Sequence, residues 1–556
     1  MKWIWMAFIC IGVAYATPPP VPSAGIIERE LEKEYEATPL EPKKELPDVQ
    51  IDIPEEKLEI PEGTSLEVKE VEIQGNEAIS CEEIEKWVEG FLGEELTLKD
   101  IYALCQAIDR GYAKRGYFLA RAYPPPQTVE GGVLRIEVLE GRLGEVHIEP
   151  GKFYSERFVG SYFEALQGKG LNYDQFMRAL LLLNENSDLQ AGAVFAKGKE
   201  VGTADVTIKV KDARPIHLYL NGNNYGRDIT TNFRLGGRVD AGSLFLYGDK
   251  LSVAEVVGFP VNALYFTDVV YRAPVNRKGT FVELAYLFSK FHVEEQLDLQ
   301  LKGRSDIGTA KVSHAVHRSR EMSVDIFGYF DVKQIQNFVL GSRTSFDKLR
   351  VATWGYTLDR FSKKDQRHFL NARVAVGIPD FLGGLSSVDS ECSRVGAGGL
   401  FLKFNGDYDW LQTFKQDCVF SFHGSGQWSS YKLPIPEQIY IGGVDTVRGF
   451  PLACVLGDSG YYWNAELRVP PPLLANQRFF VAHKKWKEVV QLVAFLDNGG
   501  VFFHGGSNTF LWGSGIGFRF RGLGNMSLSV DLGFPLNHKG FSSGAFMYLK
   551  VAGQAF

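Results

Sequence analysis

The chain has 556 residues and a formal net charge of −7. No basic stripe interleaved with aromatic residues appears, which argues against a nucleic-acid-binding surface. Glycine (59 residues) and aromatic residues (13%) are both frequent, whereas cysteine and methionine number 6 each. This composition is typical of an all-β protein with many turns and interfacial rings.

The first residues predict a secretory signal peptide over residues 1–16. Lys2 precedes an apolar stretch, Trp3–Val13, and the sequence Ala14-Tyr15-Ala16 then provides an A-x-A cleavage site. The alternative is a short membrane anchor, but the apolar stretch is too short to span a bilayer comfortably. No other window approaches 18 consecutive apolar residues. An exported chain without such a window is either soluble or crosses a membrane as a closed β-barrel.

Residues 17–65 form an acidic segment rich in proline. Within it, Gly25–Ala37 places Ile27, Leu31 and Tyr35 at positions i, i+4 and i+8, with charged residues between them. This spacing predicts one short amphipathic helix followed by an extended linker. Because so short a helix is marginal alone in water, we expect it to dock onto another part of the protein. A solvated, disordered tail is the alternative.

Two adjacent units of similar pattern follow, at residues 66–141 and 142–213. In the first, LEVKEVEIQG alternates as a strand does, two segments have helical spacing, and two alternating segments complete the unit. The second unit repeats the same order of strand, helix, helix, strand, strand. The repetition indicates a structural duplication, and each unit is large enough for a small core.

Residues 214–556 contain alternating segments separated by glycine, asparagine, aspartate and serine breaks. MSLSVDLGF, for example, sets one apolar face against one polar face, with Met526, Leu528 and Val530 opposite Ser527, Ser529 and Asp531. A soluble sandwich also alternates, but it closes its core within a couple of hundred residues. About 340 residues at about 20 per strand and connection predict about 16 strands, an even number that fits a transmembrane barrel.

One connection in this tract is unusually long and carries the sequence VRGF. It runs between the strands predicted at Val419–Ser430 and Asn464–Pro470 and has about 30 residues, the length of an outer loop that folds back into the pore. Arg448 lies inside it, between Val447 and the pair Gly449-Phe450. An arginine inside a barrel needs a carboxylate partner on the wall.

The next strand supplies a candidate partner in VVQLVAFLDNGGVFF. Phe495, Asp497 and Gly499 share one face of it, and that face is the lumenal one because a lone aspartate is intolerable toward lipid. Gly499 leaves room for a backbone to approach. We therefore predict that Arg448 binds Asp497 and holds the loop inside the barrel. A generic exposed arginine in a glycine-rich turn is the alternative.

Taken together, these features resemble the TpsB family of two-partner secretion transporters, within the BamA-related superfamily that includes the hemolysin-activation proteins. VRGF with the downstream F-x-D-x-G is the most specific part of the resemblance. Further matching motifs are Pro126-Gln127, Leu134-Arg135-Ile136, Glu140-Gly141, Glu437-Gln438, Gly442-Gly443, Gly457-Asp458-Ser459-Gly460 and Glu466-Leu467-Arg468. The resemblance implies a mainly β chain with two periplasmic α+β POTRA domains, a 16-stranded outer-membrane barrel and a helix that can plug its pore.

By that resemblance the protein exports a large β-rich partner protein from the periplasm to the cell surface. POTRA sheet edges would bind the unfolded client by strand addition. The acidic face of the helix would rest weakly on lumenal arginines and lysines. We expect a monomer in contact with outer-membrane lipid. An assembly factor of the same superfamily and a passive porin are the alternatives.

No enzyme is expected. The histidines are few and scattered, and neither G-x-S-x-G nor H-E-x-x-H occurs. No cluster has metal-ligand spacing, so we expect neither a metal nor a cofactor. Five cysteines follow Cys10, an odd number that cannot all pair within one chain; an oxidising compartment permits a bridge between Cys81 and Cys105.

Overall fold

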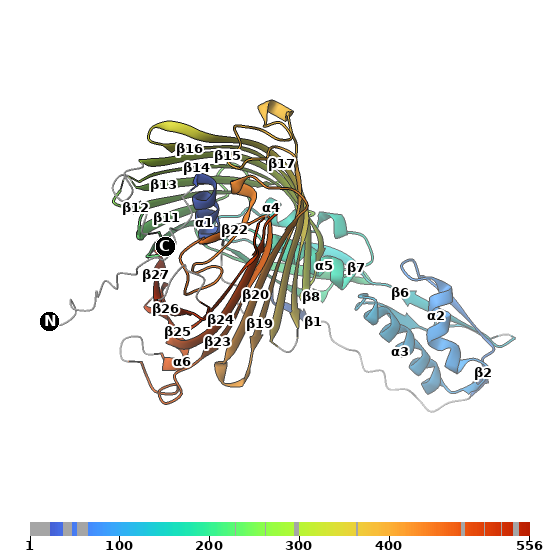
Figure 1. Ribbon diagram of the computed structural model, residues 1–556. Coiled ribbons are helices and arrows are strands. Elements are labelled where there is room, and N and C mark those ends of the chain that lie inside the picture. The colour runs from blue at the N-terminus through green and yellow to red at the C-terminus, as the bar shows by residue number, and fades with distance from the viewer. Residues whose placement is uncertain are drawn as a thin grey trace.

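The computed structural model describes residues 23–36, 47–52, 65–129, 131–227, 230–261, 263–293, 300–362, 365–479, 484–504, 506–523, 525–537 and 544–555. The signal peptide predicted for residues 1–16 and most of the predicted linker lie outside these residues. Among the residues described, no helix is long and apolar enough to cross a membrane. Three bodies follow one another in space: a barrel, the unit 142–213 at one end of it, and the unit 65–141 beyond (Figure 1).

The first unit packs two helices on a three-stranded sheet of order β3-β6-β5. Helix α3 begins after Thr97, whose hydroxyl accepts from the Asp100 N–H at 3.4 Å, while the Asp100 carboxylate accepts from the Thr97 N–H at 2.9 Å. The face of α3 that carries Ile101, Leu104 and Ile108 is buried. The elements are β2 (Leu66–Glu67), β3 (Glu70–Gln74), α2 (Cys81–Val88), β4 (Glu95–Leu96), α3 (Leu98–Lys114), β5 (Arg121–Tyr123) and β6 (Val133–Leu139).

The five cysteines after Cys10 are all free thiols. The bridge that the sequence permits between Cys81 and Cys105 is therefore not formed. Cys105 is buried in α3, whereas Cys81 is exposed at the start of α2. Burial raises the pKa of the Cys105 thiol to about 12, so it behaves as a small apolar residue of the core.

The second unit packs two helices on a sheet of order β1-β8-β9-β7. Strand β1 (Val49–Asp52) comes from the segment predicted to be an extended linker and pairs in parallel with β8, Val49 opposite Ala193. Its sequence, VQID, is too short and polar for a pattern to predict it. The other elements are β7 (Arg142–Glu149), α4 (Glu156–Gly160), α5 (Tyr173–Leu183), β8 (Leu189–Lys197) and β9 (Thr203–Asp212).

The described residues from 216 onward form a closed antiparallel barrel of 16 strands, as predicted. It closes between its first and last strands, where Tyr219–Asn223 pair with Lys550–Gln554. The strands are β10 (Ile216–Asn223), β11 (Phe233–Gly242), β12 (Lys250–Phe259), β13 (Leu264–Pro274), β14 (Thr280–Val293), β15 (Leu301–Arg318), β16 (Met322–Val339), β17 (Ser342–Ser362), β18 (Gln366–Gly377), β19 (Phe401–Thr413), β20 (Val419–Ser429), β23 (Ser459–Val469), β24 (Val490–Phe502), β25 (Thr509–Leu523), β26 (Met526–Pro535) and β27 (Phe546–Gln554).

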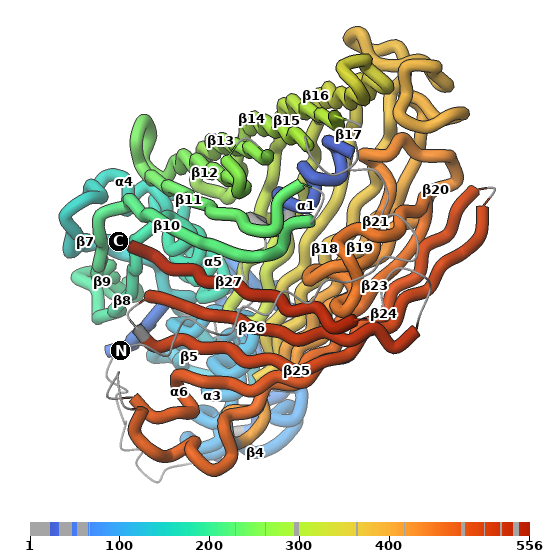
Figure 2. Tube along the Cα trace, turned by 60° about the vertical axis from the view of Figure 1, so that its left-hand side comes forward, coloured from blue at the N-terminus to red at the C-terminus, as the bar shows by residue number. Residues whose placement is uncertain are grey.

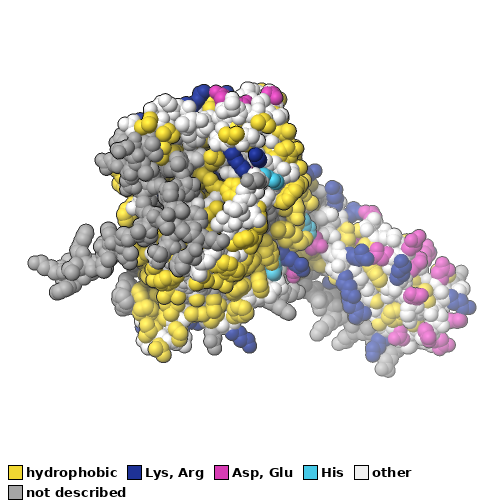
Figure 3. All heavy atoms as spheres, viewed as in Figure 1, with side chains coloured by type: hydrophobic (Ala, Val, Ile, Leu, Met, Phe, Trp, Pro, Cys, Tyr) yellow, Lys and Arg dark blue, Asp and Glu magenta, His cyan; other side chains and the backbone are white. Residues whose placement is uncertain are grey.

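The barrel wall alternates between an apolar outer face and a polar inner face. Leu284 and Tyr286 are exposed on the outside of β14, and Ile326 on the outside of β16, whereas Asp331 is buried inside. Hydrophobic side chains cover much of the described wall in the view of Figure 3, and charged side chains gather on the unit 65–141. An apolar exterior around a polar interior is the pattern of a barrel immersed in lipid.

The interior of the barrel holds two further segments. Helix α1 (Ala24–Glu36) lies inside, one residue earlier at each end than predicted, and the connection 430–458 folds back beside it (Figure 2). This connection contains β21 (Ile439–Ile441) and β22 (Val455–Gly457), which pair with each other. A short helix, α6 (Trp486–Val489), lies before β24. We call the end that carries the unit 142–213 the domain end and the opposite end the far end.

Candidate functional site

The connection 430–458 is anchored to the inner wall at the turn that carries VRGF. Backbone N–H of Arg448 donates to the Asp497 carboxylate at 3.0 Å, and the side chain adds Nε to Oδ2 at 2.8 Å and Nη2 to Oδ1 at 2.9 Å. Asp497 is fully buried and Arg448 nearly so. A bidentate, charge-assisted pair of this kind fixes both the position and the orientation of the arginine.

Two more carboxylates share the same guanidinium. Arg448 Nη1 lies 3.0 Å from Glu466 Oε2 on β23 and 3.4 Å from Asp531 Oδ2 on β26. Arg519 bridges these two acids from β25, with Nη1 at 2.6 Å from Asp531 Oδ1, and Arg468 donates to Glu466 at 2.7 Å. Three arginines thus face three acids, and we call these six residues the anchor cluster. Balanced charges with shared hydrogen bonds are what a buried ionic cluster requires.

Glycines let the loop backbone approach the wall. At Gly513 an added Cβ would lie 1.9 Å from the Arg448 carbonyl oxygen, and at Gly533 it would lie 2.7 Å from the Gly449 nitrogen. Gly449 itself has φ +92°, which side-chain-bearing residues rarely adopt. Its N–H donates to the Tyr548 hydroxyl at 3.1 Å, and that hydroxyl donates to the Phe450 carbonyl at 3.2 Å. The wall is therefore shaped to receive this turn.

The structure brings the seven residues predicted at the loop contact together. Val447 and Phe450 are buried beside Arg448 and Gly449, within an apolar cluster that extends to β24 and β25. The Phe495 ring lies under the guanidinium, with Arg448 Cζ 3.4 Å from its centroid. At Gly499 an added Cβ would lie 3.0 Å from Val447 Cγ2, so this glycine makes room for the loop.

Sequence reasoning did not predict the other four members of the anchor cluster, Glu466, Arg468, Arg519 and Asp531, nor Tyr548. Parity places Glu466 and Asp531 on the lumenal faces of their strands, and this signal identifies them as possible partners. The choice among lumenal acids depends on how far each strand is shifted along its neighbour. That register is set by pairings such as Asn464 with Asp497 and Gly517 with Asp531, which a single sequence does not specify.

Helix α1 is held by buried ionic contacts with the barrel. Glu30 pairs with Arg227, and its Oε2 lies 3.6 Å from Arg234 Nη2 on β11. The exposed fraction is 2% for the Glu30 side chain, 6% for Arg227 and 2% for Arg234. The predicted contact of the helix with arginines of the barrel is therefore present at Glu30, and it lies at a buried site where water does not screen the pair.

The same helix contacts the connection 430–458. Arg29 Nη1 donates to the Pro436 carbonyl at 3.2 Å and also to the Gln438 carbonyl. An added Cβ at Gly25 would lie 2.5 Å from Pro436 Cβ, so helix and loop touch directly. Glu437, in the same part of the loop, binds Lys333 Nζ at 2.9 Å and Lys403 Nζ at 2.5 Å.

The apolar side of α1 faces strands near the start of the barrel. Of the three residues predicted there, Ile27 and Leu31 are buried among apolar side chains such as Phe266 and Phe291. Tyr35 belongs to the helix, but its side chain lies outside the described residues. Ile26 packs instead against Tyr440 and Ala453 of the loop. The helix thus fills space between the wall and the anchored loop.

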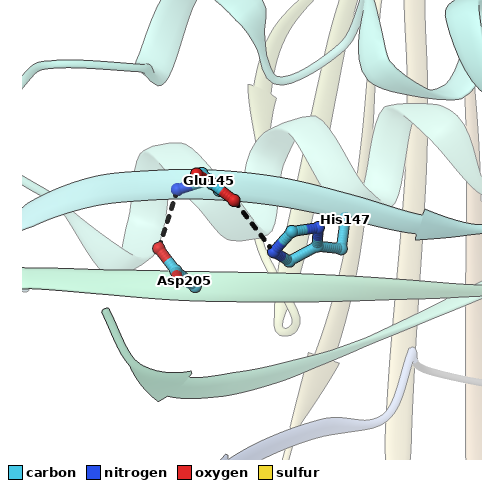
Figure 4. A group of neighbouring side chains, drawn as sticks. All are labelled: Glu145, His147 and Asp205. Atoms are coloured by element: carbon cyan, nitrogen blue, oxygen red, sulfur yellow. Dashed lines mark hydrogen bonds and ion pairs between the residues drawn. The ribbon is translucent and has the colours of Figure 1, made fainter. Parts of the chain in front are cut away.

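A separate group of ionisable side chains lies on the sheet of the unit 142–213 (Figure 4). Glu145, His147 and Asp205 place potential ligand atoms within 4.8 Å of one another. Glu145 is exposed and binds Lys199 Nζ at 2.8 Å, while its own N–H donates to Asp205 at 2.8 Å. The Glu145 and Asp205 carboxylates therefore have the partners that ordinary surface carboxylates have.

The chain was compared with known proteins. A family model described as haemolysin secretion/activation protein ShlB/FhaC/HecB matches residues 202–520, more than half of the chain, and a model of the ShlB-type POTRA domain matches residues 66–141. Heme/hemopexin transporter protein HuxB of Haemophilus influenzae is 22% identical over 468 residues, covering 82% of this chain and 81% of the relative.

Outer membrane transporter CdiB of Escherichia coli is 23% identical over 494 residues, which cover 85% of this chain and 80% of the relative. The solved structure of CdiB from Escherichia coli superposes with a TM-score of 0.76 at 22% identity, covering 90% of this chain and 92% of that chain. At this identity the superposition bears on the fold alone.

Proposed function

The chain belongs to the family of haemolysin secretion/activation proteins ShlB/FhaC/HecB, and from this premise we propose that it exports a large, β-rich partner protein to the cell surface. It is an outer-membrane barrel transporter with POTRA units in the periplasm, so the domain end is periplasmic and the far end extracellular. We propose that it works as a monomer, since one chain encloses the whole barrel. No catalytic step is assigned.

One observation carries the proposal: the pore contains a helix and a loop that are held by different contacts. The loop is covalently joined to β20 and β23 and bound to the wall by the anchor cluster, whereas α1 is attached to the rest of the chain at its C-terminal side. A pore with a tethered internal helix suits the passage of an unfolded chain better than passive diffusion. No ATP is available at an outer membrane, so the driving force must come from binding and from folding outside.

Client binding would occur at the edges of the periplasmic sheets. Strand β5 lies at the edge of its sheet, and an extended client strand could pair there. The contact between β1 and β8 supports binding by strand addition. There, an edge strand of the sheet already pairs with a strand from a distant part of the chain. We propose corresponding functional parts at residues 1–16 (signal), 17–65 (plug and linker), 66–141 and 142–213 (client binding) and 214–556 (pore).

Helix α1 would act as the plug. Deleting Ala24–Glu36 removes both the buried Glu30 pair and the apolar contacts of Ile27 and Leu31. We expect the deletion to raise ion conductance severalfold in planar bilayers while the barrel still assembles. Unchanged conductance of a correctly assembled variant would reject the plug.

The export function is tested by crosslinking a translocating client. A photoreactive amino acid is placed at one of three positions. Tyr123 lies on the exposed edge strand β5, Arg521 lies on the lumenal face of β25, and Ile516 lies on the lipid face of β25. The client is a large β-rich protein whose secretion depends on this transporter. We expect adducts at positions 123 and 521 and none at 516. Client secretion without adducts inside the pore would contradict export through this barrel.

A further inference from the structure

One turn at the periplasmic end of the barrel displays four consecutive apolar side chains. It joins β11 to β12, and the exposed fractions are 46% for Leu244, 75% for Phe245, 54% for Leu246 and 46% for Tyr247. Soluble surfaces rarely present such a run, which usually marks a contact with another molecule or a membrane. Neither the pore nor the anchor cluster uses these residues, so the export mechanism does not explain them.

The turn is held in a fixed shape by one buried carboxylate. Asp249 accepts from the backbone N–H groups of Leu244 at 2.8 Å, Phe245 at 3.0 Å and Leu246 at 2.9 Å. The Tyr271 hydroxyl donates to the same carboxylate at 2.8 Å. Because one carboxylate satisfies these backbone groups, the turn keeps a single shape in which the four apolar side chains stay exposed. The exposure is thus a property of the folded turn.

The periplasmic unit 142–213 joins this surface. Phe158 of α4 packs on Tyr247 with ring centroids 5.3 Å apart, and Tyr154 lies 6.4 Å from the same ring (Figure 2 shows α4 beside β11 and β12). Phe153, next to Tyr154, is 43% exposed. The apolar surface therefore spans both the barrel and the unit below it.

Cationic side chains flank the apolar surface. Lys152 and Arg157 are exposed, and in the sequence they flank Tyr154, one of the two residues whose rings contact Tyr247. Lys278 is exposed in the neighbouring turn between β13 and β14, which also carries Arg277; the Arg277 guanidinium lies 4.5 Å from the Phe158 ring. Apolar side chains bordered by lysine and arginine are the composition of a surface that rests in the headgroup region of an anionic bilayer.

We infer that residues 244–247, Phe153 and the flanking cations form a membrane-docking surface for anionic phospholipid in the periplasmic leaflet. The outer residues Val239 of β11 and Val253 of β12 are exposed and lead to the turn, so the apolar surface continues from the lipid-facing wall. The phosphate groups would pair with Lys152, Arg157 and Lys278. This surface holds the periplasmic unit against the membrane beside the first strands, which goes beyond the export function.

The test measures the depth of a nitroxide in the full-length protein. Phe245→Cys is labelled in a Cys81→Ser, Cys418→Ser background and reconstituted into phosphatidylethanolamine vesicles with or without phosphatidylglycerol. Power saturation compares accessibility to oxygen with accessibility to a water-soluble nickel chelate. The matched control is Val201→Cys, 93% exposed at a turn of the periplasmic unit 142–213.

We expect the label at position 245 to be severalfold more accessible to oxygen than to nickel, and the label at 201 to show the reverse. Phosphatidylglycerol should move the label at position 245 deeper into the bilayer. The double substitution Lys152→Glu and Arg157→Glu should remove this dependence on phosphatidylglycerol. Nickel accessibility at 245 equal to that at 201 would overturn the proposal. The proposal would also be overturned if phosphatidylglycerol left the depth of position 245 unchanged. The same holds if position 245 were protected from nickel only when client is added.

Discussion

The two segments inside the barrel are held in contrasting ways. The loop places one arginine among three acids that lie on three different strands, β23, β24 and β26. The helix places one acid, Glu30, beside Arg227 and Arg234, and its Arg29 donates to two backbone carbonyls and lies over the Tyr440 ring. Loop and helix both bury charge, but the loop is also fixed at both ends by the chain. From this comparison we propose that the loop is a permanent element of the pore and the helix a removable one.

Removing the arginine should break the permanent element most completely. Arg448→Ala leaves Asp497 buried without its partner, and an unpaired buried charge costs about 3–5 kcal/mol. The loop can then leave the wall, so we expect client secretion to fall to background. We expect the barrel itself to assemble. The measurement is client in the medium relative to surface-exposed transporter. Arg521→Ala, an exposed lumenal arginine on β25, is the matched control and should secrete normally.

A steric change should produce the same loss without altering charge. Gly513→Ala places a methyl group 1.9 Å from the Arg448 carbonyl oxygen, so the turn must move away from the wall. Overpacking of this kind costs about 1–3 kcal/mol. We expect strongly reduced secretion and increased protease cleavage within residues 430–458. Gly406→Ala on β19, where an added Cβ meets nothing within 4 Å, serves as control. Normal secretion by Gly513→Ala would show that close approach of the loop is dispensable.

Weakening the removable element should affect the pore more than export. Glu30→Gln removes the charge that faces two buried arginines but keeps the size of the side chain. We expect more frequent channel openings in planar bilayers, by severalfold, with secretion close to normal. Glu32→Gln on the same helix is the matched control and should leave conductance unchanged. Equal conductance of the two variants would mean that the Glu30 pair does not hold the helix.

The smallest effect is expected from one hydroxyl at the loop contact. Tyr548→Phe leaves the Gly449 N–H and the Phe450 carbonyl without their partner, which costs about 1–3 kcal/mol for a buried polar group. The anchor cluster remains, so secretion should be slightly reduced. A thermal melt of the purified protein should show a modest decrease in the unfolding temperature. If Tyr548→Phe reduced secretion as much as Arg448→Ala, the loop would be held mainly by Tyr548 and not by the anchor cluster.

The sequence predicts the contacts of the loop better than those of the helix. Strand alternation alone put Asp497 on the inner face, and this made it the natural partner of Arg448. Glu466 and Asp531 have the same parity, yet their distance from Arg448 depends on barrel closure and strand register. For the helix, the spacing of Ile27 and Leu31 predicted an apolar face. It did not indicate Arg227 and Arg234 as partners, because they come from a distant region.

We propose that the loop stays on the wall during export while the helix leaves. Two engineered disulfides test it in the same transporter. Val447→Cys with Gly499→Cys joins loop to wall, and Gly25→Cys with Pro436→Cys joins helix to loop; in each pair the two residues are in direct contact. Oxidised single-cysteine variants are the controls. We expect normal secretion with the first disulfide and blocked secretion, restored by reduction, with the second. Secretion that survives the helix disulfide, or stops with the loop disulfide, would contradict it.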